Sequence, residues 1–188
     1  MNLYELAARV IEALEAENIP YMVVGALSSS VFGIPRATKD VDIVLQLLTR
    51  DPLHRLEERL AEVVVFDPQI TFETLTGSVR HILTAKTRPP FIVELFELGS
   101  DPFVVERFSR RRAAWSALIK RQVSLPTAED VIVQKLRWGR PKDLEDARDV
   151  LAVQTPAKLD MDYIRRWSEI HQTSGHLRAI MVEIEPLL

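Results

Sequence analysis

The apolar residues of the chain recur at two periods, and the first half of the sequence switches between them several times. An opening helix is predicted by apolar residues three and four positions apart, namely Leu3, Leu6, Val10 and Leu14. A turn at residues 18–20 should end this helix, and the apolar run of residues 21–24 predicts a buried strand. Small residues after Gly25 indicate a tight turn into a short helix that Gly33 should end.

The middle of the chain is typical of strands with one helix among them. A second strand is expected at residues 40–47, and a helix should begin at Asp51-Pro52 because proline suits a first helical position. Runs of β-branched and alternating residues then predict four more strands, at residues 63–66, 71–75, 79–84 and 91–96. This order predicts an α+β fold in which a mixed, largely antiparallel β-sheet is flanked by helices.

The last third of the chain has a helical pattern. Thr127 is a good N-cap, with acids in the following turn, for a helix that should run to about Gly139. Another helix is expected from Pro141, and a third carries Tyr163 and Trp167 on one face. We therefore expect a sheet domain at residues 1–123 and a helical C-terminal subdomain, packed on it, at residues 124–188.

The composition narrows the class of protein but does not indicate a particular reaction. The chain has 188 residues, of which 47% are hydrophobic and 27% charged, and this suits one substantial core with a smaller appendage. A formal charge of -3 gives no overall reason to bind nucleic acid or a membrane. The absence of cysteine excludes disulfides and thiolate metal sites, and no segment has the roughly 18 apolar residues of a membrane span. We expect a cytoplasmic protein with no membrane partner.

Two acids, Asp40 and Asp42, interrupt the apolar run of the second predicted strand. Side chains two apart on a strand point the same way, so these carboxylates should lie close enough to share a divalent cation. Without a cation or a basic group between them, each would raise the pKa of the other. An exposed sheet face, from which both acids project into water, is the commoner explanation of such a pair taken alone.

Two other features favour a site. Glu94 is an acid in the otherwise apolar run of residues 91–96, where acids are normally paired or bound to metal. The turn from Gly25 to Ser28 follows a strand, and its backbone amides and hydroxyl could approach phosphate oxygens. Three carboxylates on two strands offer only oxygen ligands, which suits Mg²⁺ completed by substrate phosphates. The sequence therefore predicts the outline of a phosphoryl-transfer site.

These residues resemble the nucleotidyltransferase superfamily with the DNA polymerase beta type of palm domain. The shared pattern is a strand ending in Gly25-Ala26, a short helix, an Asp-apolar-Asp strand and a later acid; thirteen residues separate Ala26 from Asp40. The downstream stretch SLPTAEDVIVQKLRWGRPKDLEDARDVL resembles the helical segment of bacterial abortive-infection nucleotidyltransferases, which are toxins of toxin–antitoxin pairs. The resemblance covers roughly residues 19–151, and it makes residues 1–123 a palm-like domain.

The resemblance implies that the chain transfers NMP from an NTP, such as ATP, to an acceptor hydroxyl and releases pyrophosphate. Asp40 and Asp42 would hold two Mg²⁺ ions, and Glu94 would complete the second site and help to deprotonate the acceptor. The residues implied in nucleotide binding are Gly25, Ala26, Ser28, Lys39 and Lys135. Among these, Lys135 would point towards the β- and γ-phosphates, although a solvated helix lysine explains it as well.

Several residues depart from the pattern or have two explanations. The family usually has Gly-Gly or Gly-Ser where this chain has Gly25-Ala26, and Asp where it has Glu94. Glu97 is a rival for the third acid, but its odd offset from Glu94 places it on the opposite strand face. Three other residues are interpreted as a structural salt network between helices: Arg140, Asp143 and Asp146. Two residues just before the aspartates could contact phosphate or acceptor, or be ordinary loop charges: Arg36 and Lys39.

The sequence indicates the nature of the acceptor less clearly than it indicates the acidic residues of the site. From Arg107 to Thr127 the chain has six basic residues and no acid, which could bind RNA such as tRNA or form a solvated face. Trp115 within this stretch could stack on a base or fill the core. His81, on a predicted strand leading to the acids, could have a role in the site, but it is interpreted as a surface histidine because that is the commoner case.

Three functions stay open. The first is an NTP-dependent toxin that modifies RNA and has an antitoxin protein as partner. The second is a degenerate relative that binds a nucleotide or a partner without catalysis, which the Gly25-Ala26 departure favours. The third is transfer to a small molecule such as an aminoglycoside, since a cleft lined by acids suits a cationic drug.

Overall fold

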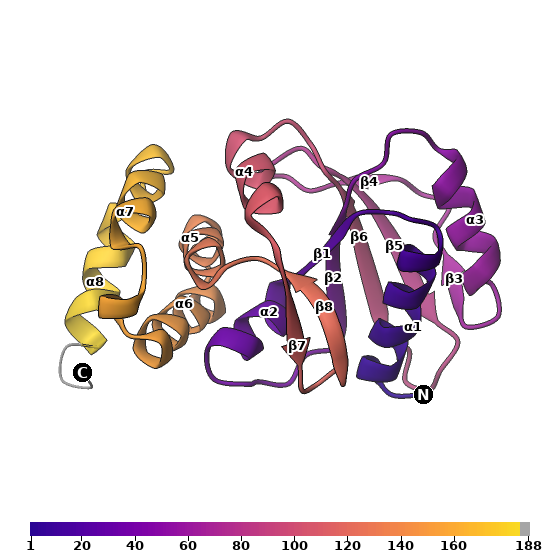
Figure 1. The fold of residues 1–188 in the computed structure, drawn as a ribbon, viewed down its shortest axis with the longest axis horizontal. Coiled ribbons are helices and arrows are strands. Elements are labelled where there is room, and N and C mark those ends of the chain that lie inside the picture. The colour runs from indigo at the N-terminus through magenta and orange to yellow at the C-terminus, as the bar shows by residue number, and fades with distance from the viewer. Residues whose placement is uncertain (185–188) are drawn as a thin grey trace. The chain divides into compact units, whose positions relative to one another are not determined.

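The computed structural model describes residues 1–184, and the chain divides into two compact units. The first unit comprises Met1–Gly25 and Thr38–Leu125, and the second comprises Ala26–Ala37 and the chain from Pro126 onward. The elements of the first unit are α1 (Leu3–Ala16), β1 (Tyr21–Val24), β2 (Asp40–Leu45), α3 (Asp51–Leu60), β3 (Val64–Phe66), β4 (Thr71–Phe72), β5 (Val79–Ala85), β6 (Ile92–Glu97), α4 (Pro102–Arg110), β7 (Arg112–Ser116) and β8 (Arg121–Leu125). Those of the second are α2 (Gly25–Phe32), which begins at the boundary residue, α5 (Ala128–Trp138), α6 (Pro141–Gln154), a 3-10 turn (Pro156–Lys158), α7 (Met161–Ile170) and α8 (Ser174–Ile184) (Figure 1).

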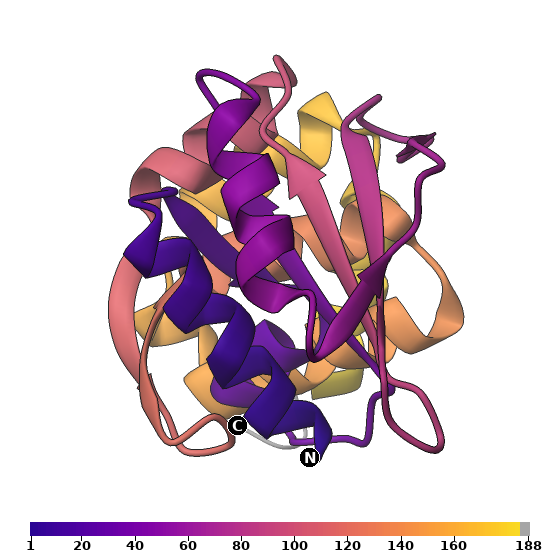
Figure 2. The same ribbon diagram turned by 90° about the vertical axis from the view of Figure 1, so that its right-hand side faces the viewer.

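The core of the first unit is one mixed sheet. Its strands lie in the order β1-β2-β6-β5-β3, and β4 pairs with β5 beside β3. The β2–β6 pair is parallel and the other pairs are antiparallel. Figure 2 shows α1 and α3 side by side over one face of this sheet. The predicted α+β fold, with a mixed sheet flanked by helices, is confirmed.

Local sequence explains where α1 begins and ends. Asn2 accepts a hydrogen bond from the Glu5 amide while the Glu5 side chain accepts one from the Asn2 amide, so a capping box fixes the N-terminus. The apolar stripe that includes Leu6 and Val10 is fully buried. Asn18 then takes a positive φ of 54°, a left-handed conformation that asparagine tolerates, and the chain turns into β1.

Two features of the first unit were not predicted. The basic stretch after residue 100 forms α4, capped by the Asp101 side chain, and the two-stranded β7–β8 sheet. The parallel pairing of β2 with β6 was also missed, because such pairing joins strands far apart in sequence and leaves no local signal. It is this pairing that determines which acids become neighbours.

The second unit is helical. Thr127 caps α5 as predicted, in a capping box with Asp130, and Gly139 ends the helix in the left-handed conformation with φ of 66°. Within the unit α5 packs on α6 and α7, and α8 on α6 and α7. Gly33, just after α2, lies against α6, where a Cβ at this position would be 3.0 Å from a methyl group of Val150. The helix α8 was not predicted.

None of the helices in residues 1–184 combines the length and the apolar character that a crossing of a membrane requires.

Candidate active site

The predicted acids lie together on one face of the sheet. In the parallel pair, Asp42 and Glu94 are register partners, and Asp40 lies two residues before Asp42 on the same face. The row continues to Ile82 on β5, the partner of Glu94, and to Val24 on β1, the partner of Asp42. All three acids are half-buried, whereas five apolar residues on the opposite face of β2 and β6 are fully buried: Val41, Ile43, Leu45, Val93 and Leu95. An acid in this row is therefore placed at an accessible surface rather than in the core.

Gly25 lies directly against Asp42. A Cβ built on Gly25 would lie 1.8 Å from Oδ2 of Asp42, and the φ of Gly25 is 63°. Any other residue would therefore collide with the carboxylate and would also strain the backbone. The glycine at the end of β1 thus makes room for the Asp42 carboxylate at the point where α2 begins.

Two polar side chains hold the outer acids. Thr38 Oγ1 donates a hydrogen bond to the Asp40 carboxylate. Arg80 Nη1 donates one to Glu94 Oε1 at 3.2 Å, and the Arg80 Nε donates to Thr71 Oγ1 at 2.9 Å. Among residues 1–184, no group of three or more His, Asp or Glu side chains is gathered closely enough to hold a metal ion as placed. Cation binding would therefore require rotation of Asp40 and Glu94 away from Thr38 and Arg80.

The donor set nevertheless fits Mg²⁺. Asp40, Asp42 and Glu94 supply carboxylate oxygens from one face of two adjacent strands, and Gly25 leaves room for the Asp42 carboxylate itself. All three are partly exposed, so a cation can reach them. Arg80 occupies Glu94 in the absence of a cation.

Glu97 belongs to a different cluster, as its odd offset predicted. Its Oε1 is 2.7 Å from His81 Nε2 and 2.6 Å from Arg50 Nη1. The interpretation of His81 as a surface residue was wrong, because its exposed fraction is only 7%. On β5 it alternates with Arg80 and Ile82 and so faces the helix-covered side of the sheet.

Lys135 is neither a solvated lysine nor a free phosphate ligand as placed. It is 3% exposed, and its Nζ lies 3.1 Å from Asp143 Oδ1 and 2.7 Å from Asp146 Oδ2. Arg140 Nε also pairs with Asp143, and Arg36 donates to both oxygens of Asp146, at 2.7 and 2.9 Å. The predicted salt network therefore exists, and it includes Lys135 and Arg36.

The pKa of Asp146 reflects this network. Burial raises the pKa of the carboxyl, but hydrogen bonds and charges from Arg36 and Lys135 more than offset burial, so the pKa lies below its usual value of 3.8. Asp146 is therefore ionised at neutral pH, and it stabilises the second unit as a buried anion with two cationic partners.

The other predicted nucleotide-binding residues are divided between the units. Lys39, next to Asp40, is exposed in the first unit. Ala26 and Ser28 lie on α2 in the second unit, and both are buried, with exposed fractions of 6% and 2%. The structure thus brings Gly25 and the three acids together within the first unit, and it places Ser28 and Lys135 within the second.

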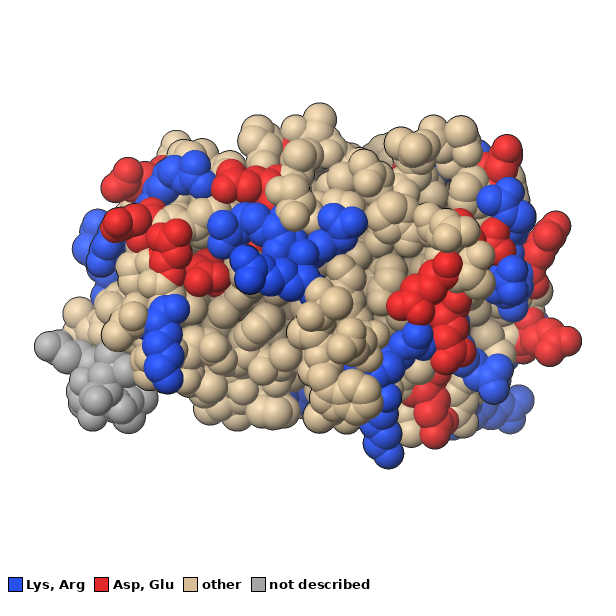
Figure 3. Space-filling view, viewed as in Figure 1, with Lys and Arg blue, Asp and Glu red and all other residues tan. Residues whose placement is uncertain are grey.

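The basic stretch after Glu106 is not one uniform patch. Arg107 is 6% exposed and stacks on Phe103, Arg111 stacks on Phe108 with its guanidinium carbon 3.9 Å from the ring centroid, and burial lowers the pKa of Arg111. Arg121 pairs with two acids of α1. Figure 3 shows basic and acidic side chains interspersed over much of one face of the molecule. The charges of the stretch therefore have several roles.

Known proteins share the fold of this chain, at low sequence identity. No family model and no curated protein matches the sequence. The structure is similar to that of an antigenic nucleotidyltransferase-like protein from Paracoccidioides brasiliensis, with a TM-score of 0.62, 16% identity, and coverage of 95% of this chain and 91% of that one. It is also similar to ANT(2'')-Ia in complex with adenylyl-2''-tobramycin, with a TM-score of 0.59, 13% identity, and coverage of 92% and 98%.

The chain has the nucleotidyltransferase fold. At these identities the likeness concerns the fold, and it bears out the fold that the resemblance implied. In this nucleotidyltransferase fold, β1 leads through Gly25 into α2, and the acids occupy β2 and β6.

Sequence reasoning missed two residues of the site, Thr38 and Arg80. Thr38 is a short polar residue two positions before Asp40, a spacing at which such side chains often bond locally. Arg80 is a charged residue at an alternating position of a predicted strand, which was a usable signal. Its contact with Glu94 follows only from the β5–β6 register, which the sequence does not show.

Proposed function

We propose that the chain is a Mg²⁺-dependent nucleotidyltransferase that transfers the NMP group of an NTP such as ATP to an acceptor hydroxyl. The observation that carries the proposal is the register pair of Asp42 and Glu94, with Asp40 on the same face and Gly25 against Asp42. The fold in which these residues occur is shared with nucleotidyltransferases, and this supports the proposal. Acids that only project into water from an exposed sheet face would not need a glycine beside one of the carboxylates, as Gly25 is beside Asp42.

Each residue has a role in this proposal. Asp40 and Asp42, with Glu94 for a second ion, would hold Mg²⁺, which when bound neutralises charge on the triphosphate and on the attacking oxygen. Glu94 is the carboxylate proposed to accept the proton of the acceptor hydroxyl. The acceptor oxygen bonds to the α-phosphorus while the bond from that phosphorus to the bridging oxygen breaks, and pyrophosphate leaves with the electron pair.

Phosphate oxygens need hydrogen-bond donors or cations close to the acids. Gly25 is the first residue of α2, and amides at a helix N-terminus suit an anion, so we assign Gly25, Ala26 and Ser28 to the triphosphate. Lys39 is exposed beside Asp40 and is the lysine that we assign to phosphate contact. The ammonium group of Lys135 balances the negative charge of two buried carboxylates, so we assign Lys135 mainly a role in stabilising the helical unit.

For the acceptor we propose RNA, such as tRNA, and for the biological role a toxin with an antitoxin protein as partner. Support comes from the acid-free basic stretch and from the resemblance of the helical segment to abortive-infection toxins. A small cationic acceptor is the second candidate, because ANT(2'')-Ia shares the fold and its structure contains an adenylylated tobramycin.

One experiment tests the reaction and separates the acceptors. The protein is incubated with each α-phosphate-labelled NTP, Mg²⁺ and either total RNA or tobramycin, and Asp42→Asn is run beside it. Label in RNA that depends on Asp42 supports the toxin assignment, and label in tobramycin supports the second candidate. The same labelled NTPs are also incubated with the protein in cell extract. If the protein binds nucleotide but transfers no label to RNA, to tobramycin or to any component of the extract, a degenerate relative is favoured over an enzyme.

A further inference from the structure

The outward face of the β7–β8 hairpin carries an uncovered tryptophan. Trp115 is 62% exposed, and its register partner on β8 is Gln122, which is also exposed. The next pair on this face is Ala113 and Ser124, two small side chains that cannot cover an indole ring. The ring is therefore flanked by one amide and two small residues on the surface of a short two-stranded sheet.

Core filling does not explain Trp115. The inward side chains of the hairpin, Ser116, Val123 and Leu125, are buried, so the hairpin is held in place without the indole. Trp167, by contrast, is buried, with an exposed fraction of only 5%. A large aromatic ring left in water, with only an amide and small side chains beside it, offers its face for stacking by a planar ligand.

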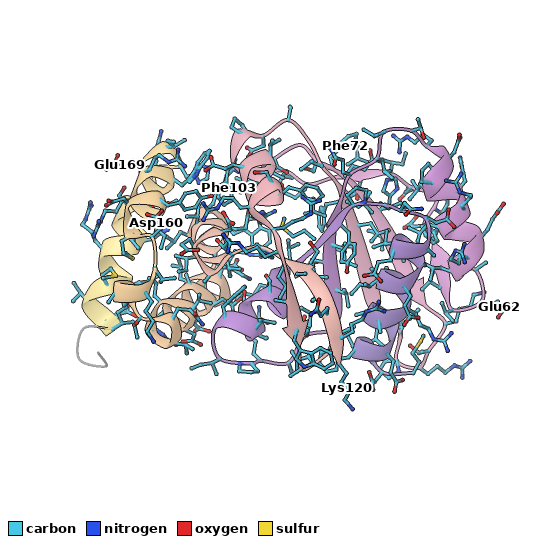
Figure 4. All side chains as sticks on the ribbon, viewed as in Figure 1. Glu62, Phe72, Phe103, Lys120, Asp160 and Glu169 are labelled. Carbon is cyan, nitrogen blue, oxygen red and sulfur yellow. The ribbon has the colours of Figure 1, made fainter. Side chains whose placement is uncertain are left out.

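The charges around this face are positive. Lys120 at the turn is exposed, and Figure 4 shows it projecting from the end of the hairpin. Arg112 is exposed at the start of β7 but is the partner of Leu125, so it belongs to the other face of the hairpin. No acid occurs between residues 107 and 128 of the sequence. Arg121 points to the other side, where it pairs with Glu12 and Glu15 of α1, so those two acids are already compensated.

We propose that the outward face of β7–β8 binds a single-stranded segment of RNA. A base stacks on Trp115, the amide of Gln122 contacts the edge of that base, and Lys120 contacts a flanking phosphate. A protein partner would be favoured by an apolar rim around the ring, whereas the residues beside this ring are an amide and two small side chains, with a lysine at the end of the hairpin. The inference rests on the proposed function and deepens it, because it assigns a part of the acceptor-binding surface.

Direct binding in EDTA tests the proposal apart from the reaction. The probe is a single-stranded RNA of about ten nucleotides and mixed sequence, within the range that small binding surfaces cover. It is titrated into the native protein and into Asp40→Asn/Asp42→Asn while tryptophan fluorescence and RNA anisotropy are followed. Both proteins should bind with quenching. Trp115→Leu should bind roughly 5- to 100-fold more weakly without quenching, and Trp115→Phe should recover part of the loss.

The salt dependence provides a second readout. Lys120→Gln should make the slope of log K against log salt less negative by about 0.7, the value for one phosphate contact on a single strand. Two matched controls should leave binding unchanged: Phe72→Ala, which removes another exposed aromatic ring, and Lys142→Gln, which removes another exposed lysine.

The outcomes separate this inference from the proposed function. Native affinity in Trp115→Leu, or no RNA binding by the native protein, would overturn the RNA surface. RNA binding that depends on Trp115, in a protein that transfers no label, would keep the surface and remove the proposed reaction. Unchanged circular dichroism of Trp115→Leu shows that the exposed ring was not needed for folding.

Discussion

Gly25 and Asp42 are matched to each other: the carboxylate occupies the space in which any side chain on residue 25 would begin. The contact connects the end of β1 to the central acid of β2. It explains why a glycine with positive φ occurs at this point of the chain, and it makes the geometry around Asp42 testable.

Gly25→Ala should destabilise the protein and disturb the site. A Cβ at 1.8 Å from Oδ2 forces Asp42 to move, and alanine is strained at this φ; together these effects should cost about 1–3 kcal/mol or more in the free energy of unfolding. Gly77→Ala is the control, because Gly77 has a similar φ of 67° with no atom within 4 Å of its Cβ. Urea unfolding should show the larger loss for Gly25→Ala. Equal losses would mean that backbone strain alone explains the glycine.

Lys135→Met should destabilise the protein by about 3–5 kcal/mol, because it leaves two buried carboxylates undercompensated. The exposed Lys142→Met should change stability by less than about 0.5 kcal/mol. Chemical unfolding of both variants tests the structural role. A Lys135→Met variant that is as stable as the native protein, yet binds nucleotide more weakly, would instead support the phosphate role that the sequence suggested.

Asp146 should contribute a pH-dependent part of the stability. Its pKa is lowered in the folded state, so its contribution is present above the unfolded value near 3.8 and is lost as the pH falls through the lower folded value. The unfolding free energies of the native protein and Asp146→Asn should therefore differ most above about pH 5 and converge towards pH 2. A difference that stays constant across this range would show that the ionised form of Asp146 is not what stabilises the fold.

Arg80→Gln should strengthen divalent cation binding. Arg80 is paired with Glu94 and places a positive charge beside the acids, so its removal frees one carboxylate and reduces repulsion of the ion. We expect Mn²⁺ to bind up to about fivefold more tightly, the scale of a partly exposed ion pair, in a titration followed by electron paramagnetic resonance without nucleotide. Arg50→Gln is the matched control, because Arg50 pairs with Glu97 on the opposite face. Equal effects of the two variants would point to a general charge effect.

The sequence predicted the parts of the site that depend on local pattern. The strand, glycine turn, short helix and second strand with alternating Asp40 and Asp42 each have a short-range signal, and the structure has all four. The opposite faces of Glu94 and Glu97 follow from the period of a strand, and they too are found. Periodicity within one strand is a property of the backbone, so tertiary structure does not alter it.

The features that the sequence did not predict depend on contacts between residues far apart in the chain. Nothing local distinguishes Lys135 from an exposed helix lysine, because its two aspartates come from the next helix. His81 was interpreted as a surface residue because its pairing with Glu97 depends on the β5–β6 register, which the sequence does not show. The register of β2 with β6 is likewise set by packing between distant segments, and it alone makes Asp42 and Glu94 neighbours.

The assignment of this sheet face as the active site is tested most directly by comparing Glu94 with Glu97, which lie three positions apart on β6. Transfer of labelled NMP in cell extract with Mg²⁺ is followed for the native protein, Asp42→Asn, Glu94→Gln and Glu97→Gln. We expect Asp42→Asn and Glu94→Gln to lose transfer by at least about 100-fold, while Glu97→Gln, on the helix-covered face, retains most of it. Transfer that survives in Asp42→Asn and Glu94→Gln would contradict the assignment of this sheet face as the active site.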